Sequence, residues 1–205
     1  MEPVLKVQIW SDLICPWCWI AEQRFERALS RFPHIDKVDV VFRAFRLMPG
    51  AAPSAVEETL AKKYGGDPRK LLSKMEEIAA EDGLIYRLSG TLVGDTLDAH
   101  RVVKLAQSLG MQKSVLEKLY KSYFTDQASL FDRSTLITRA VEAGLDTQAV
   151  ITMLGGDDFV EDVHLDQSEA ERRGIRGVPY FLFGDQTPLS GGQPEEAFAT
   201  ALAQA

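Results

Sequence analysis

The sequence predicts an α/β fold in which a long helical insertion interrupts one sheet-containing domain. Both ends of the chain carry strand and helix patterns, in the orders β-α-β and α-β-β-α, whereas the residues between them carry helix patterns only. With 205 residues and 45% hydrophobic content, the chain is long enough to bury a sizeable core. We therefore expect a discontinuous domain of residues 1–50 and 155–205, with an all-helical insertion domain of residues 51–154.

The N-terminal part predicts a strand, a helix and a second strand. Apolar and polar side chains alternate over residues 5–9, which is typical of a strand with one buried face. Apolar residues then recur at helical spacing until Pro33, while charged residues such as Glu22 and Arg24 are expected to face away. The β-branched and aromatic residues of segment 38–45 predict the second strand.

Glycine and aspartate residues divide the middle of the chain into amphipathic helices, since these residues favour helix ends and turns. The expected helices cover residues 54–64, 68–82, 95–109, 112–126, 133–143 and 146–154.

The C-terminal part predicts a helix, two short strands and a last helix. Asp157-Asp158 can cap a helix that stops at Gly174. Residues 177–184, rich in aromatic side chains, read as a strand, and residues 186–190 as its hairpin partner. The segment 191–196 then opens the last helix.

Charge and hydropathy exclude two classes of partner. With 30 acidic and 23 basic residues the net charge is -7, which disfavours nucleic acid as a partner. No apolar run reaches the roughly 18 residues that a membrane span needs, so no membrane partner is expected. Residues 1–10 carry charge and alternation where a secretory leader has a basic and then an apolar region, so we expect a cytoplasmic location.

The chain has two cysteines, Cys15 and Cys18, at the expected start of the first helix. A structural disulfide is disfavoured in a reducing cytosol, so a close-spaced pair indicates redox chemistry or a metal site. The N-terminus of a helix stabilises a thiolate, which makes Cys15 the expected nucleophile. Cys18 lies one turn further on, within disulfide range, and can resolve a mixed disulfide.

The residues between the cysteines fit this interpretation. Pro16 suits the first helical turn, where its missing N–H costs no hydrogen bond. Trp17 brings no positive charge, so we expect a less strongly oxidising couple than with a cationic residue in its place. Zinc would need about four ligands, and the three histidines show no ligand spacing, so we expect no metal; a pair of inert buried thiols is the remaining alternative.

The run Trp10–Cys18, together with Gly177-Val178-Pro179, resembles the DsbA-like thioredoxin-fold oxidoreductases, in particular their FrnE-type cytosolic branch. The resemblance implies a thioredoxin fold with a large helical insertion, and dithiol–disulfide exchange as the activity. It also implies a cis Val178–Pro179 bond, with the Val178 backbone pairing with substrate. The residue pattern alone would favour a trans proline at the start of an edge strand. Further similar segments are residues 45–49, 63–65, 95–101, 123–124, 143–146 and 190–194.

Three segments leave alternatives open. Many relatives carry Gly-Ala-Gln where this chain has Gly191-Gly192-Gln193, which we interpret as a mild change in a groove-lining segment. Asp95 stands where relatives often have Asn. His100 and Arg101 either face the active-site groove or are surface residues of a helix capped by Asp95.

The leading function is a dithiol–disulfide oxidoreductase or isomerase acting on protein or small-molecule thiols, with no bound cofactor and with glutathione as a candidate redox partner. The alternative resemblance is to kappa-class glutathione transferases and 2-hydroxychromene-2-carboxylate isomerases. Those relatives generally have Ser in place of Cys15, and an Asp-Arg pair where this chain has Gly192-Gln193. A third alternative is a holdase-like chaperone. The sequence leaves open whether the protein forms a homodimer.

Overall fold

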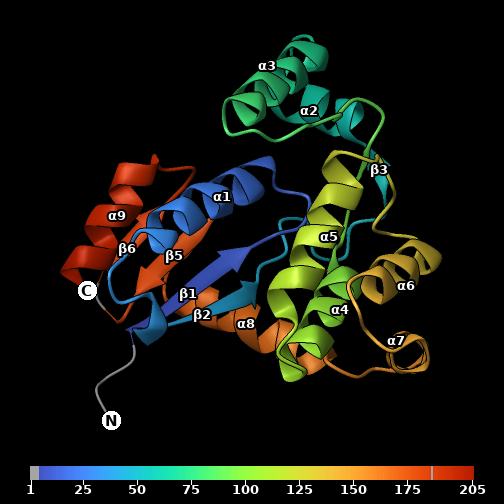
Figure 1. Ribbon diagram of the computed structural model, residues 1–205. Coiled ribbons are helices and arrows are strands. Elements are labelled where there is room, and N and C mark those ends of the chain that lie inside the picture. The colour runs from blue at the N-terminus through green and yellow to red at the C-terminus, as the bar shows by residue number, and fades with distance from the viewer. Residues whose placement is uncertain (1–4, 186) are drawn as a thin grey trace. The chain divides into compact units, whose positions relative to one another are not determined.

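A four-stranded mixed sheet is built from both ends of the chain (Figure 1). The computed structural model describes residues 5–185 and 187–205. Along the sheet the strands run in the order β2-β1-β5-β6; β1 pairs with β2 in parallel and with β5 antiparallel, and β5 pairs antiparallel with β6. This arrangement confirms the expected α/β class. The strand bounds are Leu5–Ser11 for β1, Val38–Ala44 for β2, Tyr180–Phe183 for β5 and Thr187–Ser190 for β6.

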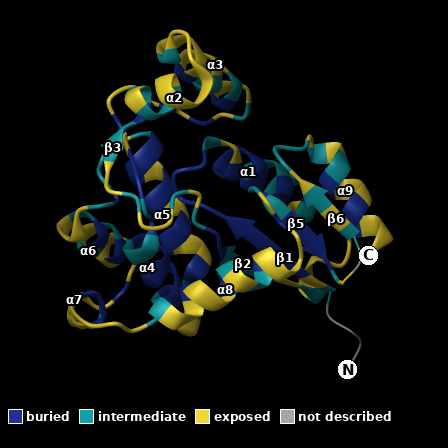
Figure 2. Ribbon diagram, turned by 180° about the vertical axis from the view of Figure 1, so that it is seen from behind, coloured by how far each residue is buried: buried dark blue, intermediate teal, exposed yellow. Residues whose placement is uncertain are grey.

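One face of this sheet is covered by α1 (Pro16–Ser30) and α9 (Glu195–Gln204), which lie side by side (Figure 1). Phe25 of α1 lies at the centre of an aromatic cluster, with ring centroids 5.4 Å from Phe181, 6.0 Å from Phe183 and 5.9 Å from Phe198. Figure 2 shows the central strands β1 and β5 as buried. The helix that begins between the two cysteines is therefore fixed by strand and helix residues from the other end of the chain.

The other face packs against the second half of α8 (Val160–Arg172). Trp10 is fully buried there, and its indole N–H donates to the Asp166 carbonyl oxygen at 3.1 Å. The Asp166 carboxylate accepts hydrogen bonds from the Ala44 backbone N–H at 2.9 Å and from the Arg43 guanidinium at 2.8 Å. Asp166 thus joins α8 to the ends of both parallel strands.

A second compact unit, residues 46–165, is mainly helical. It also contains a two-residue antiparallel ladder between β3 and β4, which the sequence analysis does not predict because two residues are too few to show alternation. The short helix η1 (Ile35–Lys37) belongs to the first unit. The remaining bounds are Ser54–Ala55 for β3, Val56–Tyr64 for α2, Pro68–Glu81 for α3, Leu92–Val93 for β4, Leu97–Ser108 for α4, Gln112–Phe124 for α5, Arg133–Glu142 for α6 and Thr147–Gly155 for α7.

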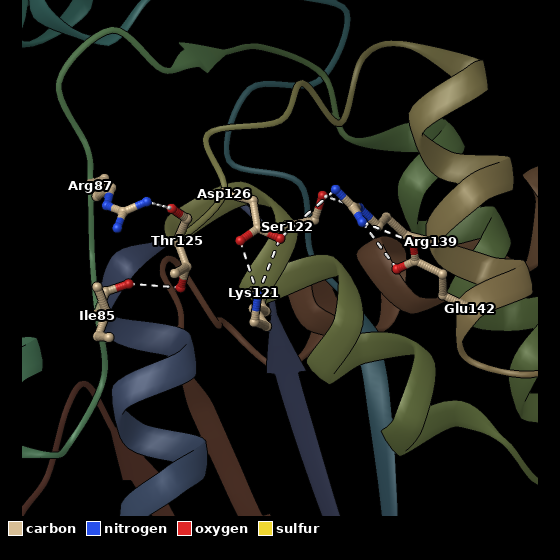
Figure 3. A network of polar contacts seen from close by, with 8 residues as sticks. All are labelled: Ile85, Arg87, Lys121, Ser122, Thr125, Asp126, Arg139 and Glu142. Carbon is tan, nitrogen blue, oxygen red and sulfur yellow. Dashed lines mark hydrogen bonds and ion pairs between the residues drawn. The ribbon is translucent and has the colours of Figure 1, made fainter.

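A polar network holds the C-terminal end of α5 in this second unit (Figure 3). Asp126 accepts a hydrogen bond from Lys121 at 2.9 Å and lies 3.8 Å from the Arg139 guanidinium. Arg139 also donates to the hydroxyl of Ser122, a fully buried residue, at 3.1 Å. Through these contacts α6 is tied to α5.

In the sequence, the boundaries between the two compact units fall at residues 45–46 and 165–166, whereas the expected boundaries are at residues 50 and 155. The Asp95 carboxylate explains the first difference, since it binds Arg46 at 3.0 Å and the Gly50 N–H at 2.6 Å. Arg101 explains the second, since its guanidinium donates to the carbonyl oxygens of Met153, Gly156 and Asp158. Arg101 is 3% exposed, so the surface position considered for it is wrong.

Two other expectations concern the hairpin before the last helix and the possibility of a membrane span. Gln186, expected to begin the hairpin partner, lies outside the described residues, as do residues 1–4 of the N-terminal segment. Within residues 5–185 and 187–205, no helix is both long enough and apolar enough to cross a lipid bilayer.

Candidate active site

Cys15 occupies the N-cap position of α1, directly after the turn that follows β1. Its backbone N–H donates to the Asp12 carbonyl at 3.1 Å, and its carbonyl accepts from the Cys18 N–H at 3.0 Å. Cys15 has extended backbone angles (φ -84°, ψ 112°), and Pro16 opens the helix. The strand, the tight turn and the proline together place the Cys15 sulfur at the positive end of the helix dipole, as the sequence predicts.

The two cysteines are free thiols with different surroundings. Cys15 retains 5% of its accessible surface, whereas Cys18 retains none. Burial, followed by the hydrogen bond and the electrostatic interaction with Cys15, raises the pKa of the Cys18 thiol well above its ordinary value. At neutral pH Cys18 is therefore a protonated thiol beside Cys15.

The charge of Glu22 is a further influence that raises the pKa of Cys18. Glu22 is only 4% exposed, so the expectation that it faces away from the core is wrong. It lies four residues after Cys18, and residues at this spacing share one face of a helix. The spacing could have revealed this position, because Cys18 itself is expected to point inward.

The loop before β5 lies against the Cys15 sulfur. The Val178–Pro179 bond is cis, as the resemblance implies. The Cys15 thiol donates to the Val178 carbonyl oxygen at 3.5 Å, a sulfur hydrogen bond that joins residues far apart in the sequence. Pro179 is buried and Val178 is half-buried. The structure therefore brings the two motifs singled out in the sequence into one site.

The segment Gly191-Gly192-Gln193 also belongs to this site. The Gly191 N–H donates to the Pro179 carbonyl at 2.8 Å, which links the segment to the cis-proline loop. Trp17 lies against Gly192 so closely that a Cβ there would be 2.4 Å from the indole Cε3. Replacement of Gly192 by Ala is therefore not the mild change expected from the sequence.

His100 belongs to α4 of the second unit and is 3% exposed, so the surface position considered for it is wrong. Its backbone N–H donates to the Thr96 carbonyl at 3.0 Å, and Asp95 accepts from the Leu97 N–H at 3.1 Å. Among the residues that the structure describes, no three His, Cys, Asp or Glu side chains gather in a way that could hold a metal ion.

The sheet order, the cysteine pair at a helix N-terminus and the cis-proline beside it define a thioredoxin-fold protein with a dithiol site. The protein-family model described as the DSBA-like thioredoxin domain matches residues 6–203. The chain belongs to this family.

Solved structures agree with this assignment. A probable DsbA oxidoreductase from Streptomyces coelicolor is 38% identical, with a TM-score of 0.93 over 98% of this chain and 89% of that one. Two more distant structures share the fold. A cytosolic disulfide reductase from Pseudomonas aeruginosa, DsbM with GSH, is 16% identical, with a TM-score of 0.69 and 98% of each chain covered. A 2-hydroxychromene-2-carboxylate isomerase is 14% identical, with a TM-score of 0.67 over 97% of this chain and 95% of that one.

Proposed function

We propose that this protein is a dithiol–disulfide oxidoreductase in which Cys15 is the nucleophile and Cys18 the resolving thiol. The observation that carries the proposal is the difference between the two thiols. Cys15 lies at the helix N-terminus and keeps some exposed surface, whereas Cys18 is fully buried and has a raised pKa. A thiolate is the reactive form in disulfide exchange, so the two cysteines have separate roles.

The reduced protein acts in two exchange steps. The Cys15 thiolate attacks one sulfur of a substrate disulfide; a mixed disulfide forms, the substrate S–S bond breaks, and its second sulfur leaves as a thiolate that takes up a proton. Cys18 then gives up its proton and attacks the Cys15 sulfur. The Cys15–Cys18 disulfide forms, the first substrate sulfur is released as a thiol, and the substrate has gained the two electrons that the protein lost.

The cis-proline loop supplies the docking edge in this proposal. Val178 lies within 3.5 Å of the reacting sulfur through its carbonyl oxygen, and an extended substrate segment can pair with a backbone edge at this position. Strand addition of this kind suits a peptide whose cysteine must reach the sulfur of Cys15, a residue that is only 5% exposed.

We further propose a cytoplasmic protein of the FrnE type, with glutathione as a redox partner and no bound cofactor. The similarity to DsbM, the cytosolic disulfide reductase from Pseudomonas aeruginosa with GSH, supports this assignment. Glu195 and Glu196 lie in the first turn of α9, and Glu195, ion-paired with Arg27 and Arg31, already fills the place that a carboxylate ligand would take there. Glutathione is therefore proposed as a transient thiol at Cys15 and not as a ligand of the α9 N-terminus.

Single substitutions test the mechanism, and the chain offers a clean background because it has only two cysteines. Cys15→Ser should abolish insulin reduction. Cys18→Ser should also lose turnover but accumulate mixed disulfides at Cys15, and mass spectrometry of the proteins trapped in cells then identifies the substrates. Full activity in both variants would overturn the proposal. Isomerisation of 2-hydroxychromene-2-carboxylate that persists in Cys15→Ser would favour the isomerase class instead.

A further inference from the structure

We propose that Gly192 is a positioning residue for Trp17, and that the Trp17 ring seated on it is the subsite for an apolar side chain beside the substrate's reactive cysteine. This inference rests on the proposed function and specifies the substrate class. It assigns to Gly192 a role in substrate preference, which thiol chemistry alone does not require.

The first observation is the closeness of Trp17 to the Gly192 backbone. A Cβ built on Gly192 would lie 2.4 Å from Cε3, 2.9 Å from Cζ3 and 3.3 Å from Cδ2 of the indole. All three atoms belong to the six-membered ring, so the side chain approaches Gly192 along one edge of that ring. The contact exists only because residue 192 lacks a Cβ.

The second observation is that this backbone cannot easily move away. The Arg24 guanidinium donates to the Gly192 carbonyl at 2.9 Å and to the Gln193 carbonyl at 3.4 Å. The Gly191 N–H donates to the Pro179 carbonyl at 2.8 Å. With the segment held on both sides, a Cβ at Gly192 must displace the Trp17 ring and not the backbone.

The third observation concerns Trp17 itself. It lies two residues after Cys15 and is 36% exposed, although a tryptophan is usually largely covered. Any substrate that forms a mixed disulfide with Cys15 must lie beside this exposed ring. Indole rings bind aromatic and aliphatic side chains well, whereas small polar and negatively charged side chains gain little there.

Gly192 is also distinct from its neighbour Gly191 in backbone conformation. Gly191 has φ +81°, a region in which any other residue is strained, whereas Gly192 lies outside this region. An Ala at position 192 therefore brings one change, the contact with Trp17. This makes Gly192→Ala a clean perturbation of the ring position.

The experiment uses two peptides that differ in one residue, Phe or Ser next to the cysteine of an otherwise identical disulfide. For the unaltered protein, kcat/KM should favour the Phe peptide about five- to tenfold, mainly through KM, as expected for one aromatic contact. In Gly192→Ala this preference should fall to about one. Gly155→Ala is the matched control, because a Cβ there meets no described atom within 4 Å.

A compensating substitution separates positioning from general damage. Trp17→Phe lacks Cε3 and Cζ3, the two indole atoms that a Cβ at position 192 would meet at less than 3 Å, so the Trp17→Phe, Gly192→Ala double variant should recover at least half of the lost preference on a logarithmic scale. Equal preference in Gly192→Ala and the unaltered protein, or no recovery in the double variant, would overturn the inference. If the unaltered protein exchanged disulfides with neither peptide, the proposed function itself would fail.

Discussion

Replacement of Asp166 by Ala tests how α8 is attached to the central sheet. The Asp166 carboxylate is 2% exposed and accepts from the Ala44 N–H, which belongs to a residue 3% exposed. Loss of the acceptor for a buried N–H costs about 1–3 kcal/mol. The ion pair with Arg43 adds at most about 1 kcal/mol, because the Arg43 side chain is 28% exposed and also donates to Gln8. The expected loss is therefore about 1–4 kcal/mol.

Urea unfolding followed by circular dichroism measures this loss as a shift of the midpoint at unchanged slope. Asp166→Asn keeps one oxygen acceptor and should lose about half as much as Asp166→Ala. Asp162→Ala, an exposed position on the same helix, is the control and should stay within about 0.5 kcal/mol of the unaltered protein. A loss below about 1 kcal/mol in Asp166→Ala would refute the reasoning.

Three further predictions follow from other parts of the molecule. Iodoacetamide at neutral pH should modify Cys15 first, and Cys18 only at a pH well above the ordinary range or after unfolding, because burial raises the pKa of Cys18; peptide mapping that finds equal labelling would contradict this. Although desolvation opposes it, the hydrogen bond from Ser89, followed by bonds from backbone N–H groups, lowers the pKa of Glu57. The stability that Glu57 contributes is thus present above the ordinary Glu pKa and lost as pH falls through the lowered value, so Glu57→Gln should flatten the unfolding profile between about pH 6 and pH 3. Arg101→Met should lower Tm by several degrees in differential scanning calorimetry, since three carbonyl oxygens lose their donor, and an unchanged Tm would exclude that role.

Local features of the site could be predicted from sequence because they depend on neighbours in the chain. The start of α1 after Cys15 follows from Pro16 and from the apolar spacing behind it. The expectation that Cys18 is less exposed than Cys15 follows from their positions at the start of the helix, and the observed burial of the two residues agrees with it.

Features that depend on distant partners could not be predicted in the same way. Helical periodicity identifies which face of a helix is apolar but not what covers it, so it does not reveal that Phe181, Phe183 and Phe198 surround Phe25. The contact between Trp17 and Gly192 joins residues from opposite ends of the chain, and no local pattern encodes it. The role of Arg101 depends on backbone carbonyl groups more than fifty residues away in the chain. Every residue type has such a carbonyl group, so the side chains of that segment do not reveal the contact.

The strand order has a consequence for synthesis on the ribosome. Strand β1 emerges first, but it pairs with β5, and this pairing joins Val7 to Phe183. The pairing can therefore form only after nearly the whole chain has been translated. Residues 46–165 form a continuous unit that can fold during this interval. The aromatic partners that fix Phe25 of α1 are also translated last. The nascent protein therefore carries two uncovered cysteines through most of its synthesis, and it completes its own dithiol site only as β5, β6 and α9 leave the ribosome.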